Sequence, residues 1–140
     1  MIVEVTGPRG GKLPKDFQAY AMLAMHSFAK QLGISRLHTN IEVKFHHKVF
    51  VEGSTEGFCE SLDKRNFVID ACIYSNWLAT LAHEMVHVKQ FARGELDCSL
   101  QYWKGRNHTD TEYWDQPWEK EARKLQHKMV IAFEKEINSE

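Results

Sequence analysis

The residues with the clearest chemical potential lie at positions 83–87, where the sequence reads H-E-M-V-H. His83 and His87 are four residues apart, so on a helix both imidazoles project from one face and can bind a single cation. Neutral imidazole is a good zinc ligand, and two of them leave tetrahedral positions for a third protein ligand and a water. Glu84 is rotated by about 100° around the helix axis, so it can reach such a water and transfer its proton as a general base. This H-E-x-x-H arrangement is the one with which zinc metallopeptidases hydrolyse peptide bonds.

The third ligand has to come from another segment, and a helix predicted to begin at Pro117 offers two carboxylates. Glu119 and Ala122 are three residues apart and share a helix face, whereas Glu121 points about 100° away from Ala122. A small residue such as Ala122 lets two helices approach closely around a metal. Glu119 is therefore the favoured third ligand and Glu121 the second choice, although the helix dipole alone also favours a glutamate in the first turn after Pro117.

The helix that carries the two histidines is predicted to be buried. It runs from Ser75 or Asn76, either of which can cap it, to about Arg93, and Gly94 supplies the C-terminal stop. The rest of this helix is almost entirely apolar or small, and two histidines and a glutamate are costly to bury without partners. The alternative, two surface histidines beside a solvated glutamate, requires this face to be exposed.

The remaining elements predict an α+β fold with three main helices and a sheet of three to five short strands. The first helix opens at Pro14 and stops at Gly33, with apolar residues at helical spacing between them. Strands are predicted at Ile2–Thr6, 41–45, 58–61 and 66–73, with 49–51 as a continuation or partner of the second and a turn at 52–57. The polar stretch 95–116 is predicted to be a functional loop or a cover for the site.

Length and composition limit the class of protein. The 140 residues suit one globular domain, and no repeat or linker divides them, so residues 1–140 are predicted to form a single domain. The formal net charge of −1 gives no strong signal for nucleic acid. No segment approaches the roughly 20 apolar residues of a membrane span, and the N-terminus lacks a secretory signal, so a cytoplasmic location is expected. Cys59, Cys72 and Cys98 are odd in number and widely spaced, which favours reduced thiols.

Residues 83–87, followed by P-W-E-K-E-A at residues 117–122, resemble the zincin-type metallopeptidases, in particular the group whose glutamate ligand lies in an E-x-x-A helix. The longer phrases TLAHEMVHVKQ at 80–90 and WKG at 103–105 are similar to small SprT-like metallopeptidases of phages and bacteria. The resemblance covers residues 66–125. It implies a zincin-like fold, with an active-site helix, a backing helix and a sheet whose edge strand lies along the cleft. It also implies one Zn(II) per chain and, for a phage-encoded protein, the host cytoplasm.

The chain departs from the SprT-like pattern at the third ligand. SprT-like proteases take this ligand from a downstream histidine, and the candidate here is His108, 21 residues beyond His87 in a polar segment. His108 is therefore kept as an alternative to Glu119. A further donor is needed to stabilise the developing oxyanion of the substrate. The candidates for that donor are Tyr102, Tyr113, His108 and Arg123.

The expected partner is a peptide or protein substrate, which can add as an extended strand to residues 66–73 if these form the sheet edge. Two other functions stay open. One is a non-catalytic zinc-bearing module that holds a partner, and function without turnover in Glu84→Gln would favour it. The other is an SprT-like protease acting on DNA-associated proteins, and a salt-dependent mobility shift would favour that function.

Overall fold

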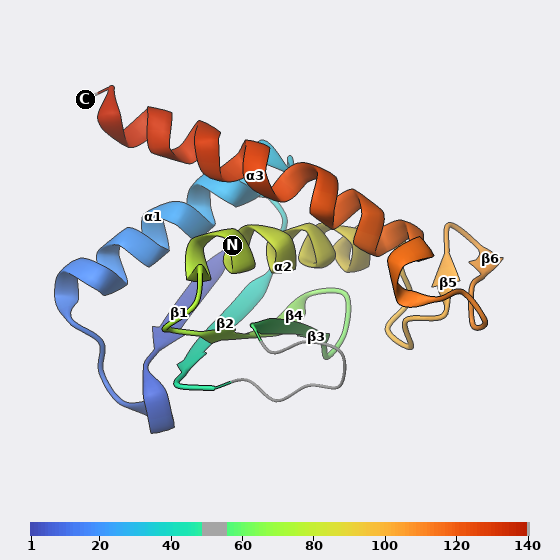
Figure 1. The fold of residues 1–140 in the computed structure, drawn as a ribbon, viewed down its shortest axis with the longest axis horizontal. Helices are drawn as coiled ribbons and strands as arrows, with labels where there is room; N and C mark the ends of the chain where they lie inside the picture. The colour runs from blue at the N-terminus through green and yellow to red at the C-terminus, as the bar shows by residue number, and fades with distance from the viewer. Residues whose placement is uncertain (49–55, 140) are drawn as a thin grey trace.

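A computed structural model describes residues 1–48 and 56–139 of the chain. The described residues form three long helices and a four-stranded mixed sheet, which confirms the α+β class (Figure 1). The helices are α1 (Lys15–Gln31), α2 (Trp77–Ala92) and α3 (Pro117–Asn138). The strands of the sheet are β1 (Ile2–Thr6), β2 (Asn40–His46), β3 (Gly57–Ser61) and β4 (Asn66–Cys72). The strand predicted at 49–51 and most of the turn predicted at 52–57 lie outside the described residues.

The sheet has the strand order β1-β2-β4-β3. β1, β2 and β4 are parallel to one another, and β3 runs antiparallel to β4. β3 and β4 are joined by a turn in which the Asp63 carboxylate accepts hydrogen bonds from the backbone N–H groups of Arg65 and Asn66. β4 is therefore an internal strand, and the expectation that residues 66–73 offer an edge to a peptide is wrong. Alternating burial indicates which side chains face the core, but it does not indicate which strands are neighbours.

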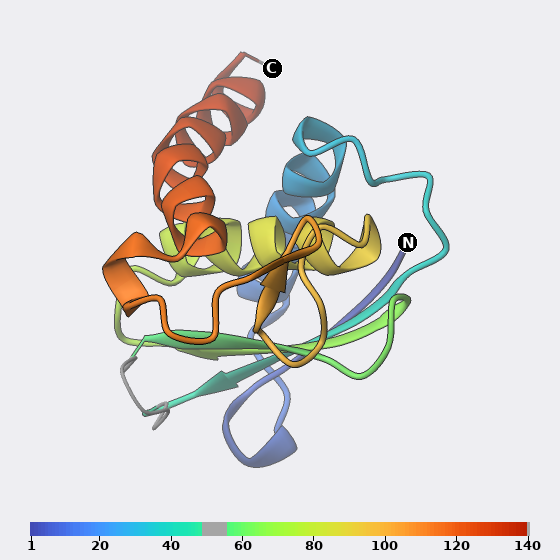
Figure 2. The ribbon, with the colours of Figure 1, turned by 90° about the vertical axis from the view of Figure 1, so that its right-hand side faces the viewer.

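All three long helices cover one face of the sheet (Figure 2). The alternation in the strands matches this arrangement, because every second residue is buried under the helices. On β2 and β4 these buried residues are Ile41, Val43, Phe45, Phe67, Ile69 and Ala71. Burial of such side chains contributes about 25 cal/mol per Å² of apolar area and holds the helices on the sheet.

Helix α2 lies between the sheet and α3, with α1 beside it. It begins where predicted, because the Asn76 side chain accepts a hydrogen bond from the backbone N–H of Ala79. It ends at Ala92, and Gly94, two residues later, has the positive φ of +70° that suits glycine after a helix. Within it, Met85, Val86 and Val88 are fully buried, so the helix is held on several sides.

The connection between α2 and α3 is more ordered than the predicted loop. It contains a two-stranded hairpin, β5 (Tyr102–Trp103) and β6 (Arg106–Asn107), and a short 3-10 helix at Tyr113–Asp115. The hairpin turn consists of Lys104 and Gly105, both at positive φ, which is the backbone that two-residue hairpins require. This connection lies against the start of α3, next to the α2–α3 interface (Figure 2).

In the described part of the chain, no helix combines the length and the apolar character needed to cross a membrane.

Candidate metal centre

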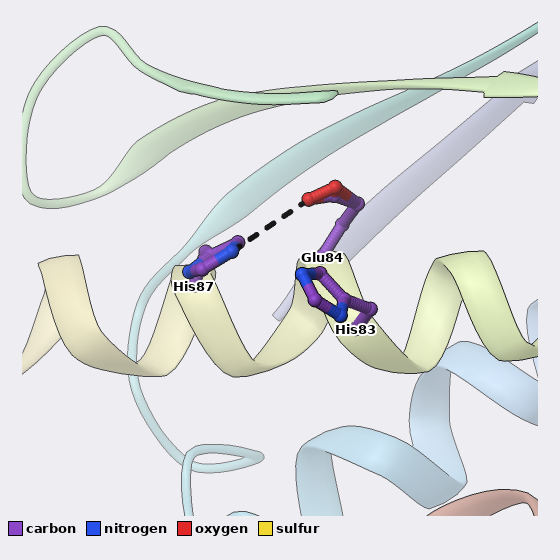
Figure 3. A group of neighbouring side chains, drawn as sticks. All are labelled: His83, Glu84 and His87. Atoms are coloured by element: carbon purple, nitrogen blue, oxygen red, sulfur yellow. Dashed lines mark ion pairs between the residues drawn. The ribbon is translucent and has the colours of Figure 1, made fainter. Parts of the chain in front are cut away.

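Three polar side chains of α2 lie close together in the interior. The ligand atoms of His83, Glu84 and His87 all lie within 4.8 Å of one another, and this group could hold a metal ion. Glu84 is 5% exposed and His87 is 7% exposed, while His83 is half-buried. Figure 3 shows Glu84 extending from the helix toward the sheet, with its carboxylate 3.9 Å from Nε2 of His87.

Glu119 joins this group from the first turn of α3. Its Oε1 lies 2.9 Å from Nε2 of His83 and 3.1 Å from Nε2 of His87. Trp118 and Ala122, which lie on either side of it in the sequence, are both buried. Ligand atoms around a tetrahedral zinc, at bond lengths of about 2.0–2.2 Å, lie roughly 3.3–3.5 Å apart. The two distances from Glu119 Oε1 to the imidazole nitrogens therefore need to lengthen by only a few tenths of an ångström to match a zinc site.

Each histidine is also held from behind by a glutamine. Nδ1 of His87 lies 2.7 Å from Oε1 of Gln90, and Nδ1 of His83 is hydrogen-bonded to Oε1 of Gln126. An amide oxygen can only accept, so each Nδ1 carries a proton and each Nε2 is left to face Glu119. Histidine ligands in metal sites are commonly oriented by such a bond from their second nitrogen.

The orientation of the Gln90 amide follows from its surroundings. Its Nε2 donates to the backbone carbonyl of Trp118 and to the carboxylate of Glu121, both at 3.0 Å, and neither of these groups can donate. Oε1 must therefore face His87. Gln90 is completely buried, so these bonds do not compete with water. The consequence is that Nδ1 of His87 keeps its proton, so that loss of a proton from this ring would free Nε2 for a metal ion.

The two alternative third ligands lie elsewhere. The Glu121 carboxylate bonds to Gln90 and, at 3.0 Å, to Nζ of Lys89, behind the histidines. His108 bonds Oγ1 of Thr111 at 3.0 Å, and its ring packs edge-on against Trp118. The structure thus brings Glu119, and neither alternative, into contact with both imidazoles.

The charges of the group depend on one another. Burial raises the pKa of Glu84 above its usual value. Burial alone would lower the pKa of His87, but its hydrogen bond to Glu119 and the charges of Glu84 and Glu119 raise it to about 9. Burial alone would raise the pKa of Glu119, but the hydrogen bonds from His83 and His87 hold it well below its usual range. In the metal-free protein, protons on the imidazoles thus supply the positive charge that a metal ion can supply in their place.

The group lines a cavity of about 620 Å³ between α2, α3, β3 and the 95–116 connection. Of the oxyanion candidates, Tyr113 and Arg123 line this cavity, whereas Tyr102 and His108 are not among its lining residues. Gly57 on β3 forms the wall opposite Glu84, and a Cβ there would lie 3.6 Å from Cγ of Glu84 and 2.3 Å from Cγ2 of Thr80. The edge strand β3 therefore approaches the helix as closely as it does because residue 57 has no side chain.

Sequence reasoning did not identify Gln90, Gln126 and Gly57 as parts of the site. Gln90 had a usable signal, because it lies three residues after His87 on a predicted buried helix, where an amide needs partners. Gln126 lies seven residues after Glu119, two turns along the same face of α3. Gly57 had no signal, since its role depends on the distance between two elements.

Comparison of the chain with protein-family models, with curated proteins and with solved structures finds no match.

Proposed function

We propose that this protein is a zinc-dependent metallopeptidase that holds one zinc ion per chain with His83, His87 and Glu119. The observation that carries the proposal is the convergence of two imidazole Nε2 atoms on one Glu119 oxygen, with a buried carboxylate, Glu84, beside them in a cavity. The donor set of two nitrogens and one carboxylate oxygen is typical of catalytic zinc sites, which keep a fourth position for water or substrate.

A bound zinc ion supplies a Lewis acid that polarises the substrate carbonyl and lowers the pKa of water toward 7. Glu84 is the proposed general base, because its carboxylate lies close to the ligands without bonding to them as Glu119 does. Its raised pKa brings it nearer to neutral pH, which favours accepting a proton from water and returning it to the leaving amine. Tyr113 lines the same cavity, and its hydroxyl is the proposed donor to the developing oxyanion.

The arrangement also supports a zincin-like architecture, with α2 as the active-site helix and α3 as the backing helix. Within the described residues, β3 is the edge strand on the cavity side of the sheet, and Gly57, Phe58 and Cys59 line the cavity. We propose that an extended peptide pairs with β3, and not with the 66–73 strand that the sequence suggested. Main-chain pairing would place the scissile bond beside Glu84, because Gly57 lies against that side chain.

The decisive experiment is Glu84→Gln in zinc-loaded protein, with hydrolysis of a casein or mixed-peptide substrate as the readout. Loss of a general base costs roughly 10²- to 10⁴-fold in rate, so hydrolysis should fall by that amount. Zinc content by mass spectrometry or atomic absorption should stay at one ion per chain. The matched control is Glu134→Gln, because Glu134 is an exposed glutamate near the end of α3 that does not line the cavity and should leave both readouts unchanged.

Undiminished hydrolysis in Glu84→Gln would end the proposed mechanism. A wild-type protein that binds one zinc but hydrolyses no peptide would favour the non-catalytic zinc-bearing module instead.

A further inference from the structure

Arg123 is a cation in the proposed active-site cavity that has no counter-ion among residues 1–48 and 56–139. It lies on α3 one turn after Glu119, so the two side chains project from the same face of the helix, and both line the cavity. In the described part of the chain, no carboxylate lies within ion-pair distance of its guanidinium. Three carboxylates line the cavity: Glu84 and Glu119 face the histidines, and Glu56 makes no ion pair with Arg123.

The known contacts of Arg123 use only a part of its bonding capacity. Nη2 donates to the backbone carbonyl of Trp114 at 2.6 Å, and the guanidinium carbon lies 4.3 Å from the centroid of the Trp114 ring. A guanidinium carries five N–H donors in a planar fork. Nη1 is buried and has no hydrogen-bond partner among the described residues. An unpaired buried donor is costly, and it costs more when the group is charged.

The surroundings of Arg123 favour an anion. Gln126 and His127 follow it on α3 and also line the cavity, and neither brings a negative charge. The N-terminal turn of α2, which includes Asn76 and Ala79, lines the cavity too, and the N-terminus of a helix attracts anions. Trp114, which covers the guanidinium, is 68% exposed, so its ring can shift to uncover the fork at little cost in buried area.

We propose that Arg123 binds a carboxylate of the peptide substrate, supplied either by an acidic side chain or by the peptide's own C-terminus. A planar guanidinium pairs with a carboxylate through two parallel N–H···O bonds, which uses the donors that the protein leaves free. The substrate class of the proposed peptidase is then a peptide with a carboxylate near the scissile bond, on the side of the cavity toward the N-terminus of α2. This inference rests on the proposed function.

The test is peptide binding to zinc-loaded Glu84→Gln protein, measured by calorimetry. The first probes are alanine octapeptides with an acetylated N-terminus and an amidated C-terminus, in which a single Glu or a single Gln is placed at each position in turn. The second probes repeat the Gln series with a free C-terminal carboxylate. A charge-assisted pair is worth enough that a carboxylate peptide should bind about tenfold to a hundredfold more tightly than its neutral match. Arg123→Gln should remove this preference, and Arg123→Lys should keep a part of it.

The matched control is Lys124→Gln, which removes the neighbouring exposed cation that does not line the cavity and should preserve the preference. Preference for Glu peptides identifies an acidic side chain as the source, and preference for free C-termini identifies the terminal carboxylate. The inference is overturned if carboxylate peptides bind no better than neutral ones, or if Arg123→Gln weakens both equally. Carboxylate binding through Arg123 without hydrolysis by the wild-type protein would support the inference and remove the proposed function, whereas hydrolysis without the preference would do the reverse.

Discussion

The two sides of α2 that meet at the site differ in how completely their polar groups are paired. On the side toward α3, His83 and His87 are bonded through both ring nitrogens, to Glu119 in front and to a glutamine behind. On the side toward β3, the Glu84 carboxylate lies 3.9 Å from the nearest imidazole nitrogen, beyond hydrogen-bond distance. The paired side fixes the histidine rings in position, and the loosely paired side leaves the carboxylate of Glu84, the proposed general base, without a hydrogen bond to either ring. This division of roles predicts different consequences for substitutions on the two sides.

The largest effect on the α3 side is expected for Glu119→Gln. An amide keeps the shape of the side chain but loses the charge that faces both Nε2 atoms, so zinc affinity should fall by more than about a hundredfold. Zinc titration against a fluorescent chelator measures this change. His108→Asn is the control for the alternative ligand and should leave the affinity within about twofold, since His108 faces Thr111. A larger loss in His108→Asn than in Glu119→Gln would reassign the third ligand.

The next largest effect is a loss of zinc affinity that should differ between the glutamine partners of the two histidines. Gln90→Met keeps the volume of the side chain but removes the oxygen that orients His87, and partners of this kind are worth about 10- to 100-fold in metal affinity. Gln126→Met should cost less, because the Gln126 and His83 side chains are only half-buried and water can replace the lost bond. The same zinc titration compares the two variants. Equal losses of zinc affinity in the two variants would show that the difference in burial between Gln90 and Gln126 does not affect metal binding.

On the β3 side, Gly57→Ala tests the close approach of strand and helix. The added Cβ would meet Cγ2 of Thr80 at 2.3 Å, and overpacking of this kind costs about 1–3 kcal/mol of unfolding free energy. Urea denaturation measures the loss. Thr80→Ser removes the opposing methyl group but keeps the hydroxyl that donates to the Asn76 carbonyl at 3.1 Å. The double variant should therefore regain most of the loss, and additive effects of the two substitutions would contradict the contact.

The sequence predicted where the helices of the site begin and end better than it predicted which strands lie beside one another. The start of α2 at Asn76, its end before Gly94 and the start of α3 at Pro117 all follow from local chemistry, because caps and stops depend on residues within one turn. Helical spacing also distinguished Glu119 from Glu121. The order of strands does not follow from such patterns, because an internal parallel strand and an edge strand can show the same alternation of burial. The position of β4 inside the sheet was missed for this reason.

The supporting residues of the site were missed for a related reason. Gln126 is recognisable as a partner of His83 only once two helices are placed against each other, because the two residues are 43 positions apart. The hairpin at Tyr102–Trp103 and Arg106–Asn107 was hidden in a stretch that reads as polar loop, since two-residue strands are too short to show a period.

The smallest expected effect is the pH dependence of the stability of the metal-free protein, which arises from the ionisable groups between α2 and α3. A rise in pH should lower this stability, whereas it should raise the affinity for zinc. The pKa of His87 is about 9 in the folded protein against about 6.5 in an unfolded chain, so its stabilising contribution is complete below pH 6.5 and is lost as the pH rises through 9. Glu84, whose pKa burial raises, acts in the same direction, because its folded form binds protons more readily than the unfolded chain, and its contribution starts to be lost above about pH 4.5. Glu119, whose pKa is lowered, contributes fully above about pH 4.5 and loses that contribution only in stronger acid.

The urea midpoint of metal-free protein should therefore fall between pH 6.5 and 9, by the equivalent of about 1–3 kcal/mol. Zinc affinity should rise over the same range, because zinc displaces the proton from Nε2 of His87. A urea midpoint of metal-free protein that rises between pH 6.5 and 9 would show that the imidazoles are neutral in the folded chain. In that case the polar groups of α2 that face α3 would be no more strongly paired than those that face β3.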